Sequence, residues 1–306
     1  MKNNRGIYFL SEDRIFDLTI AFLNSFRKYN PDIPLCLIPA GGNILRLKHL
    51  QKKYNFSIYS NRELFNLFDE IGASFHGRVF GQYRKLVMWE GDFDEFIYID
   101  TDTVVLANID FAFRFLSEYE FITSHSNIPN IIKFVWKDSI FNTGQLTAEQ
   151  VSFAANTGFI VSKKGALTLE NIKSKVEGAL MLSLHMEPSC KEQPFLNYLI
   201  VTSGKRYTSL FVLAAKNKFP PETMLEYWAG AKGGMVKDGQ IVFSGGRHKV
   251  LLVHWAGKLQ PTTLDRIIFF ILRILHIKKK DDEPAIRFFM PYKKLWRYYR
   301  FMHESS

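Results

Sequence analysis

The stretch FIYIDTDTVVL, residues 96–106, places two aspartates one residue apart between two apolar runs. Residues 96–99 have the length and composition of a strand that is buried on both faces, and this strand ends at Asp100. Burying two like charges together costs free energy unless a cation or a proton compensates them. The stretch therefore predicts a core strand whose carboxyl end carries a functional pair, Asp100 and Asp102.

The segments before this strand alternate between strand and helix patterns. GIYFL, from Gly6, is an apolar strand, and Phe16, Ile20, Leu23 and Phe26 then recur at helical spacing. IPLCLIPAGG is a second strand closed by turn residues. Helical stretches are predicted after it over NILRLKHLQKKYNF, then through Phe68 and from Gln82 to Trp89. Strand, helix and strand at this spacing form a βαβ unit. We therefore expect an α/β fold with a mixed, mostly parallel sheet flanked by helices.

The chain beyond the aspartates continues the same pattern. YEFITSH and NTGFIVSKKGAL are predicted strands, EQPFLNYLIVTSG is a predicted helix, and KVLLVHWAGKLQP is a late strand that runs into a loop. Neither an internal repeat nor a low-complexity linker interrupts the sequence before Pro261. We expect one α/β domain over residues 1–261, followed by a basic helical tail over residues 262–306.

The composition is that of a globular, basic protein. The chain of 306 residues is 47% hydrophobic, which is enough for a sizeable core and excludes a disordered protein. Forty Lys and Arg residues against thirty Asp and Glu residues give a formal charge of +10. This excess favours a polyanionic partner: nucleic acid, an anionic membrane surface or a phosphate-bearing small molecule. Half of it lies in the tail, which from Pro261 onward holds ten basic and five acidic residues.

Several sequence features bear on the cellular setting. Cys36 and Cys190 are the only cysteines, and neither lies in a CxxC or Cys/His cluster, which argues against a disulfide framework or a structural zinc site. The N-terminal segment MKNNRGIYFLSEDR lacks the apolar core of a secretory signal. The apolar stretch Ile267–Ile277 is interrupted by Arg273 and is shorter than the roughly 20 residues that span a bilayer. We expect a cytoplasmic protein that can lie on a membrane without crossing it.

Two aspartates at a strand end suit a hard divalent cation. Residues i and i+2 face opposite sides of a strand, but where the chain turns both carboxylates can reach one ion, directly or through water. Oxygen ligands favour Mg²⁺ or Mn²⁺, which bridge phosphates in nucleotide chemistry. The alternative is that Asp100 caps the next element and Asp102 is a solvated turn residue. Their position beyond an apolar strand favours the metal site, because ligands of open α/β sheets bind at the carboxyl ends of the strands.

An apolar strand followed by D-x-D fits two enzyme classes. It resembles the haloacid-dehalogenase-like phosphatases, in which Asp100 would be the nucleophile and Asp102 the acid and base. It also resembles the GT-A class of nucleotide-sugar glycosyltransferases, in which the pair holds the metal that neutralises a diphosphate leaving group. The phosphatases need a late acidic pair after an apolar strand, whereas Asp281 and Asp282 follow IKKK in the polar part of the tail. The transferase is therefore favoured.

The wider context resembles glycosyltransferase family 8 and its glycogenin-like relatives. FGQYRKLVMWEGDFDEFIYIDTDTVVLANID is similar to the family's KL..W helix, strand and D-x-D-T-[LV]-V-L. ANTGFIVSKKGAL resembles N-[ST]-G-x-[FIM], CKEQPFLNYLI resembles D-Q-x-x-[LF]-N, and VHWAGKLQP resembles H-[FYW]-x-G-x-x-K-P. The order and spacing agree over most of the chain, from residue 6 to residue 261. The resemblance implies a GT-A, Rossmann-like fold.

The resemblance also implies three groups of site residues: metal ligands, residues that bind the donor nucleotide, and catalytic residues around the sugar. The implied metal ligands are Asp100, Asp102 and His254; the nucleotide-binding residues are Ser11, Lys85, Thr101, Gly257 and Lys258; the catalytic residues are Asn156, Glu192 and Gln193. Outside the motif, His254 would be interpreted as a core histidine and Lys85 as a solvated helix residue. Asn156 and Gln193 would be turn and helix-cap residues.

Two positions depart from the family pattern. Glu192 replaces the usual Asp and adds a methylene next to the sugar. Gln260 precedes the proline where the family has its Lys, and Lys258 stands two residues earlier. These departures bear on donor choice and on whether Lys258 reaches the β-phosphate.

The expected chemistry follows from the leaving group. The negative charge that develops on a nucleoside diphosphate is stabilised by a divalent cation and a basic residue. We therefore predict a glycosyltransferase that uses Mn²⁺ or Mg²⁺ to transfer a hexose from a UDP-sugar to an acceptor hydroxyl. The resemblance implies retention of the anomeric configuration. The alternative without catalysis is a membrane-surface protein on an inactive transferase scaffold, which would be marked by a lost metal ligand; none is lost.

The tail interleaves basic residues with apolar and aromatic ones. LDRIIFFILRILHIKKK is apolar over most of a helix, and IRFFMPYKKLWRYYRFMHE mixes Phe, Tyr and Trp with Lys and Arg. This composition suits the headgroup layer of an anionic membrane. Packing on the main domain is the alternative, and binding of single-stranded nucleic acid is the least favoured. Similar tails occur in family 8 transferases of bacterial surface-glycan synthesis, which implies a glycan or lipid-linked acceptor.

Overall fold

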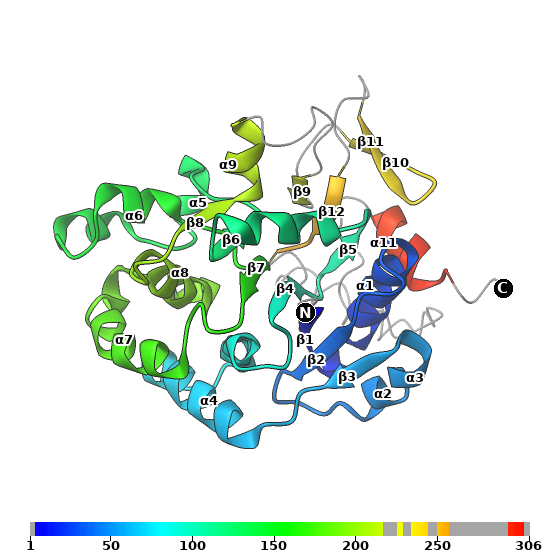
Figure 1. Cartoon of the computed structure of the whole chain (residues 1–306), viewed down its shortest axis with the longest axis horizontal. Coiled ribbons are helices and arrows are strands. Elements are labelled where there is room, and N and C mark those ends of the chain that lie inside the picture. Colours follow the sequence, from blue (N-terminus) through cyan, green and yellow to red (C-terminus); the bar gives the residue numbers. More distant parts are fainter. Residues whose placement is uncertain (1–3, 217–224, 229–233, 244–249, 257–292, 303–306) are drawn as a thin grey trace, which may run out of the picture. The chain divides into compact units, whose positions relative to one another are not determined.

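The computed structural model describes residues 4–216, 225–228, 234–243, 250–256 and 293–302 (Figure 1). The chain forms two compact units, each made of segments that are far apart in the sequence. Unit 1 comprises Met1–Phe16, Asp32–Asp100 and Ile109–Pro221, and unit 2 comprises Asp17–Pro31, Thr101–Asn108 and Glu222–Ser306. One of the points at which the chain passes from one unit to the other is the peptide bond between Asp100 and Thr101.

Unit 1 is built around a seven-stranded sheet in the order β3-β2-β1-β4-β7-β6-β8 (Figure 1). Its strands are β1 (Arg5–Ser11), β2 (Leu35–Pro39), β3 (Phe56–Ile58), β4 (Glu95–Asp100), β6 (Phe121–Thr123), β7 (Phe159–Lys163) and β8 (Tyr207–Ser209). The strand that ends at Asp100 is therefore the central one, between β1 and β7.

The sheet is mixed and mostly parallel. Strand β1 is parallel to β2 and β4, β2 is parallel to β3, and β6 is parallel to β8. Strand β7 is antiparallel to both of its neighbours, β4 and β6. The interior of β4, residues 96–99, is fully buried, as expected for a strand covered on both faces. The predicted α/β fold with a mostly parallel sheet flanked by helices is confirmed.

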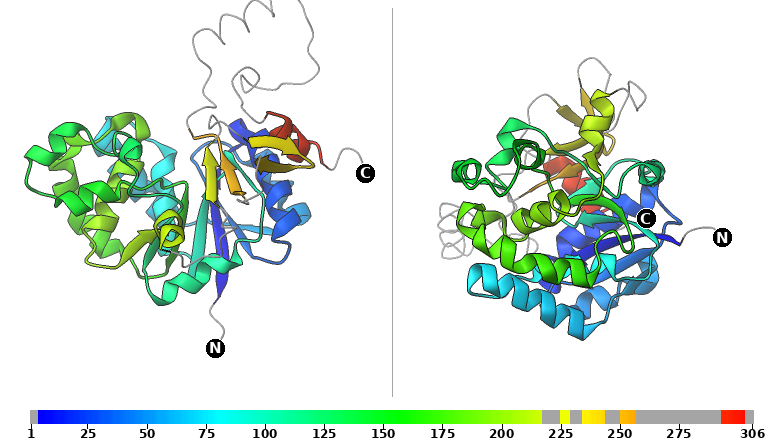
Figure 2. Two further views of the ribbon diagram at one scale, coloured as in Figure 1. Left: turned by 90° about the horizontal axis from the view of Figure 1, so that it is seen from above. Right: turned by 60° about the vertical axis from the view of Figure 1, so that its left-hand side comes forward.

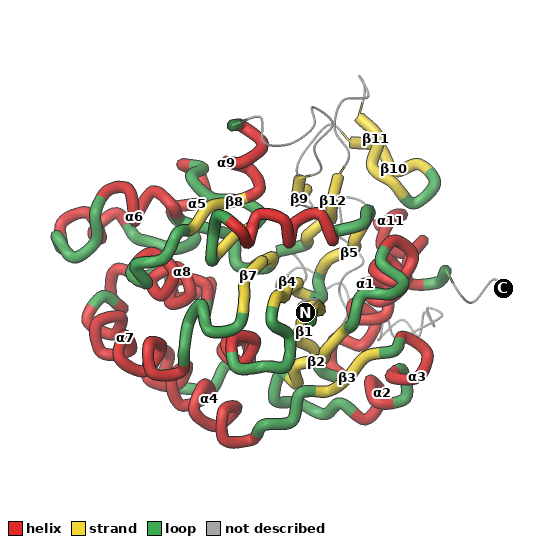
Figure 3. The backbone as a smooth tube through the Cα atoms, in the orientation of Figure 1, coloured by secondary structure: helices red, strands yellow, loops and turns green. Residues whose placement is uncertain are grey.

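Helices and short 3-10 helices (η) connect the strands of unit 1 (Figures 2 and 3). They are η1 (Asp13–Ile15), α2 (Leu45–Lys48), α3 (Gln51–Tyr54), α4 (Arg62–His76), η2 (Gly81–Trp89), η3 (Asp110–Ser117), α5 (Pro129–Ile132), η4 (Asp138–Asn142), α6 (Ala148–Phe153), α7 (Leu169–Met181), η5 (Ser183–His185), η6 (Pro188–Cys190), α8 (Gln193–Val201) and α9 (Leu210–Ala215). Helix α4 begins after Asn61, whose side chain accepts a hydrogen bond from the Leu64 N–H at 3.1 Å. It ends at Gly77, which has a φ of 68°.

Two predicted helices differ in detail from the structure. The single helix expected over NILRLKHLQKKYNF is split into α2 and α3, because the chain tightens at the junction, where Leu50 N donates to Leu47 O at 2.9 Å. Asn55, with a φ of 48°, ends the second piece. The segment expected as a helix up to residue 89 is the 3-10 helix η2.

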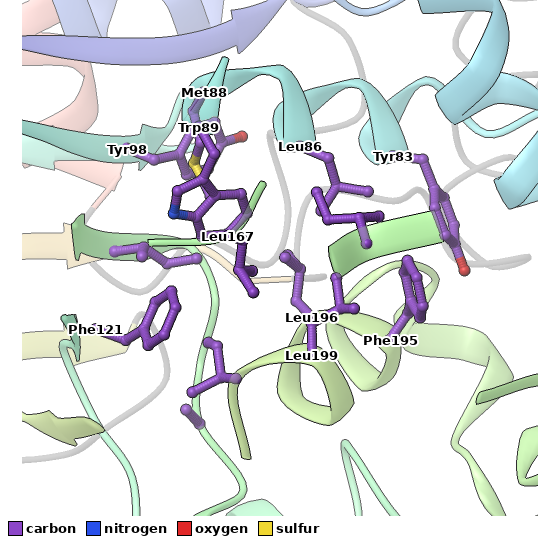
Figure 4. Close-up of a cluster of buried hydrophobic side chains, with 14 of the residues drawn as sticks. Tyr83, Leu86, Met88, Trp89, Tyr98, Phe121, Leu167, Phe195, Leu196 and Leu199 are labelled. Atoms are coloured by element: carbon purple, nitrogen blue, oxygen red, sulfur yellow. The ribbon is translucent and has the colours of Figure 1, made fainter. Parts of the chain in front are cut away.

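A continuous apolar core joins one face of this sheet to η2, α4, α7 and α8. Figure 4 shows Tyr83 and Leu86 of η2 facing the buried side chains of α8. The rings of Tyr83 and Phe195 stack with their centroids 6.0 Å apart and their planes 25° apart. This packing fixes η2, which carries Lys85, against α8, which begins directly after Glu192.

Unit 2 contains a three-stranded sheet and a hairpin. The elements are β5 (Thr103–Val105), β9 (Leu225–Trp228), β12 (Val250–His254), β10 (Gly234–Lys237) and β11 (Gln240–Phe243). Strand β12 lies between β5, to which it is antiparallel, and β9, to which it is parallel. Asp238 and Gly239, with φ of 49° and 72°, form the two-residue turn of the hairpin. The last residue of β12, His254, is paired in register with Thr103 and with Trp228.

Two helices from opposite ends of the chain meet in unit 2. They are α1 (Phe16–Tyr29) and α11 (Lys293–Arg300). The Asn24 amide donates to the Tyr299 carbonyl at 2.7 Å, and the Arg300 guanidinium pairs with Asp17 at 2.7 Å. The buried side chains of α11 are Leu295, Trp296 and Tyr299. This part of the tail therefore packs within unit 2.

The rest of the tail lies outside the described residues. This applies to the apolar segment Ile267–Ile277, for which a helix is predicted, and to the acidic pair Asp281 and Asp282. Within the ranges given above, no helix is long and apolar enough to cross a membrane.

Candidate metal and donor site

Asp100 is held at the carboxyl edge of the sheet of unit 1, where ligands of open α/β folds bind. Its backbone N–H donates to the Gly158 carbonyl at 2.8 Å. The Tyr98 hydroxyl and the Lys85 ammonium both donate to the carboxylate atom Oδ1, at 2.6 and 3.2 Å. The Asp100 side chain is 29% exposed. Its carboxylate is therefore oriented from within the core while remaining accessible to a ligand.

Lys85 lies at the centre of a buried charge cluster. Its side chain is 1% exposed, and its ammonium contacts Asp100 at 3.2 Å and Glu192 at 2.7 Å. It also lies over the ring of Tyr98, 4.5 Å from the centroid. Burial lowers the pKa of Lys85, but the carboxylates of Asp100 and Glu192 outweigh it and raise that pKa above its usual value. The side chain is thus a permanent cation that ties the end of β4 to the start of α8.

The start of α8 is tied to the loop before β7. The Gln193 amide donates to the Phe134 carbonyl at 3.1 Å and accepts from the Thr157 N–H at 3.3 Å. The Asn156 side chain accepts from the Gly158 N–H at 2.9 Å. The structure therefore places Asn156 and Gln193 around one loop, whose Gly158 carbonyl also receives the Asp100 N–H.

The remaining predicted site residues are distributed as follows. Ser11, which is fully buried, ends β1 one residue beyond Leu10, the register partner of Asp100. Thr101, 4% exposed, separates the two aspartates. Gly257 and Lys258 lie outside the described residues.

In unit 2, Asp102 and His254 form a close pair. The His254 atom Nε2 lies 3.2 Å from the Asp102 atom Oδ1, and the Trp255 N–H donates to the Asp102 carbonyl at 3.0 Å. The second ring nitrogen of His254, Nδ1, lies 2.5 Å from the Glu226 atom Oε1. The His254 side chain is 4% exposed. The sheet β5-β12-β9 therefore brings together residues from three distant segments of the sequence.

The two carboxylates control the charge of His254. Burial lowers the pKa of the imidazole, but Asp102 and Glu226 outweigh it and raise that pKa well above its usual value. Without another cation nearby, these carboxylates therefore favour the imidazolium form of His254.

Asp100, Asp102 and His254 form an Asp-Asp-His set of candidate metal ligands. Only Thr101 separates the aspartates, so the backbone keeps Asp100 close to the Asp102–His254 pair. Carboxylate oxygens and an imidazole nitrogen are donors that Mn²⁺ and related divalent ions accept. The aspartate side chains are 29% and 26% exposed, which leaves an ion access to them. The donor set therefore fits a divalent cation.

Three residues of these networks were not predicted from the sequence. Tyr98 and Glu226 contact the candidate ligands, and Asn197 of α8 exchanges hydrogen bonds with the backbone of Ala155 at 2.6 and 2.9 Å. Asn197 falls inside the EQPFLN motif and could have been found there. Tyr98 stands within an apolar strand, where nothing in the sequence marks its hydroxyl as functional, and Glu226 belongs to no recognisable motif.

Solved structures of other proteins resemble the fold of this chain. No protein-family model and no curated protein matches the sequence. The glycosyltransferase GlyE of Streptococcus pneumoniae TIGR4 has a TM-score of 0.53 at 13% identity; the match covers 99% of this chain and 62% of GlyE, so this chain spans less than two thirds of that protein. The galactosyltransferase LgtC, solved in complex with donor and acceptor sugar analogues, has a TM-score of 0.56 at 14% identity; the match covers 90% of this chain and 98% of LgtC.

Identity at this level is evidence of a shared fold alone. The chain has the mixed α/β fold of GT-A glycosyltransferases, as expected from the sequence. Membership of family 8 stays a prediction. The matched fold is the one that the glycosyltransferase interpretation of the aspartate pair predicts.

Proposed function

We propose that the protein is a metal-dependent glycosyltransferase that moves a hexose from a UDP-sugar to an acceptor hydroxyl, with retention of configuration, in glycan or glycolipid synthesis. The observation that carries this proposal is the Asp102–His254 pair, 3.2 Å apart, next in the sequence to a core strand that ends at Asp100. A fold shared with GT-A transferases supports it, as do the donor and acceptor sugar analogues bound by LgtC.

In this proposal Asp100, Asp102 and His254 hold Mn²⁺ or Mg²⁺. When bound, the cation supplies positive charge to the diphosphate leaving group. Lys85 keeps the Asp100 carboxylate in place by its ion pair, so that Asp100 presents the same geometry before and after the donor binds. The other proposed contacts of the nucleotide are Ser11, Thr101, Gly257 and Lys258.

The donor sugar is proposed to lie at the start of α8, against Asn156, Glu192 and Gln193. Glu192 is 6% exposed and is held by Lys85 at 2.7 Å, and the Gln193 amide is held at both of its polar ends. Side chains fixed in this way reorganise little when a sugar binds, which favours transfer.

A screen of nucleotide sugars tests the proposal. We expect slow, metal-dependent hydrolysis of one UDP-sugar in the absence of acceptor, measured as UDP release, because water takes the place of the acceptor hydroxyl. Removal of Mn²⁺ and Mg²⁺ with a chelator should abolish UDP release, and adding Mn²⁺ back should restore it. Cleavage of a phosphate ester without hydrolysis of any UDP-sugar would establish the phosphatase instead. Metal-dependent UDP binding without hydrolysis would indicate the inactive scaffold.

We further propose that the tail brings the protein to the cytoplasmic face of an anionic membrane, where a lipid-linked acceptor would be found. The support is compositional: the basic cluster of Lys278, Lys279 and Lys280 follows the apolar segment Ile267–Ile277. A nucleic-acid partner is not proposed, because a phosphate-bearing donor and a lipid surface account for the basic charge.

Replacing Lys278, Lys279 and Lys280 together by Gln is expected to weaken binding to anionic vesicles about 100-fold, at about 1 kcal/mol for each basic residue near the surface. The measurement is co-sedimentation with vesicles of phosphatidylglycerol and phosphatidylcholine. Deleting the whole tail is not a clean test, since α11 packs within unit 2.

The control for this prediction replaces Lys48, Lys52 and Lys53, three lysines from α2 and α3, by Gln. It removes the same net charge from outside the tail and should leave vesicle binding within about twofold, because in this proposal the tail is the part that contacts the lipid. Equal losses in both triple variants would show that overall charge, and not the tail, determines binding.

A further inference from the structure

Glu226 is a fully buried carboxylate on β9, which runs parallel to β12. Its atom Oε1 lies 2.5 Å from His254 Nδ1 and accepts a hydrogen bond from Trp228 Nε1 at 2.8 Å. Val253, the neighbour of His254 on β12, is fully buried. The carboxylate therefore lies in an apolar sheet and is directed at the imidazole.

A purely structural role does not account for an acidic residue at this position. Burying a carboxylate costs several kcal/mol unless hydrogen bonds compensate it, and an apolar side chain of similar size is often as stable or more so. Strand β12 is composed of Val and Leu up to His254, so an apolar partner on β9 would pack well. An apolar residue could supply neither the hydrogen bond to His254 nor the acceptor for Trp228 Nε1, and of these two contacts only the first acts on a candidate metal ligand.

The two nitrogens of an imidazole are not equivalent once one of them is engaged. With a proton on Nδ1 shared with Glu226, the ring cannot flip without losing that hydrogen bond, so Nε2 stays directed at Asp102, 3.2 Å away. Carboxylates that accept from the non-ligating nitrogen of a histidine fix both its tautomer and its orientation at metal sites.

We infer that Glu226 is a positioning residue of the metal site: its hydrogen bond to Nδ1 of His254 presents Nε2 as the metal-binding atom. This inference rests on the proposed function, since it requires that His254 is a metal ligand. Trp228 supports the arrangement by donating to the same oxygen of Glu226.

Mn²⁺ binding to the full-length chain tests the inference through two matched variants. Glu226→Gln keeps the length of the side chain and an oxygen that accepts from Nδ1–H, but loses the charge. Glu226→Asp keeps the charge but is one methylene shorter, so its carboxylate no longer reaches Nδ1. The dissociation constant comes from the EPR signal of free Mn²⁺ during a titration, and electron spin-echo modulation reports a directly bound ¹⁴N of histidine.

If Glu226 positions His254, Glu226→Asp should weaken Mn²⁺ binding about 10- to 100-fold, the usual effect of changing a residue that holds a metal ligand in place. It should also reduce the ¹⁴N modulation. Glu226→Gln should remain within about threefold of the unchanged protein and keep the modulation. The variant Trp228→Phe removes one donor to Glu226 but leaves both the carboxylate and the imidazole in place, so it should also stay within about threefold. Circular dichroism confirms that each variant is folded.

Other outcomes overturn the inference in distinguishable ways. Equal Mn²⁺ binding by Glu226→Asp and the unchanged protein would show that the contact positions nothing. A loss in Glu226→Gln as large as in Glu226→Asp, in folded protein, would show that charge acts and not the hydrogen bond. If His254→Ala binds Mn²⁺ normally and the unchanged protein shows no ¹⁴N modulation, the metal site itself is wrong, and the proposed function fails together with the inference.

Discussion

The variant Asp102→Asn is expected to lower the rate of UDP-sugar hydrolysis by about a thousandfold, because a catalytic metal contributes several kcal/mol and each 1.4 kcal/mol is a factor of ten. Asn has the size of Asp and keeps an oxygen that can face His254 Nε2. It removes the negative charge that would hold the cation between Asp100 and His254. The measurement is UDP release at saturating donor, repeated over a range of Mn²⁺ concentrations.

Asp110→Asn is a matched control, since it makes the same chemical change at an exposed aspartate at the start of η3. We expect its rate to stay within about twofold, as for most surface substitutions. If folded Asp102→Asn keeps more than a tenth of the rate and an unchanged dependence on Mn²⁺, Asp102 does not act through a metal. Loss of Mn²⁺ binding with an unchanged rate would mean that the reaction does not require the ion.

The fold could be predicted from the sequence because its central strand has a recognisable apolar pattern. Residues 96–99 are apolar without alternation, which occurs where a strand is covered on both faces, and the structure places this strand between β1 and β7. The strand also ends at a polar residue, which marks the edge of the sheet. Short elements were less predictable, because α2 and α3 are only four residues each and depend on local turn geometry.

The site was predictable only where its residues belong to motifs. The Asp102–His254 contact joins segments 152 positions apart, and the late apolar strand VLLV was the only local sign of where His254 would lie. The partners of the candidate ligands were not predictable. Glu226 faces His254 because β9 and β12 pair in one particular register, and a sequence does not reveal register between strands so far apart.

The burial of Lys85 could not be predicted from the sequence either. In the sequence it stands beside Arg84 in a polar-looking RK pair, which usually signals a solvated surface. In the structure Arg84 pairs with Asp69 while Lys85 turns into the core to meet Asp100 and Glu192. The direction of the two side chains follows from how η2 packs against α8, and this is a tertiary property.

Lys85→Met is expected to destabilise the fold by about 3–5 kcal/mol, the usual cost of removing one partner from a buried ion pair. Met has a similar length, so packing is retained, but Asp100 and Glu192 lose the cation between them. The measurement is urea unfolding followed by circular dichroism. Because the carboxylates raise the pKa of Lys85 above its usual value despite burial, its contribution is fully present below pH about 10.4. The difference between the two proteins should therefore stay constant from pH 7 to 9 and shrink only in stronger alkali.

Two further variants separate the charge from general effects of the substitution. Lys163→Met removes a lysine that is 38% exposed and 3.5 Å from Glu120, and it should cost less than about 1 kcal/mol, as exposed pairs do. The double variant Lys85→Met with Glu192→Gln should be more stable than Lys85→Met alone, because it removes one of the two uncompensated carboxylates. A loss below about 1 kcal/mol in Lys85→Met would show that water, and not Lys85, solvates Asp100 and Glu192. If the double variant has a lower free energy of unfolding than Lys85→Met, Glu192 stabilises the fold through contacts other than this ion pair.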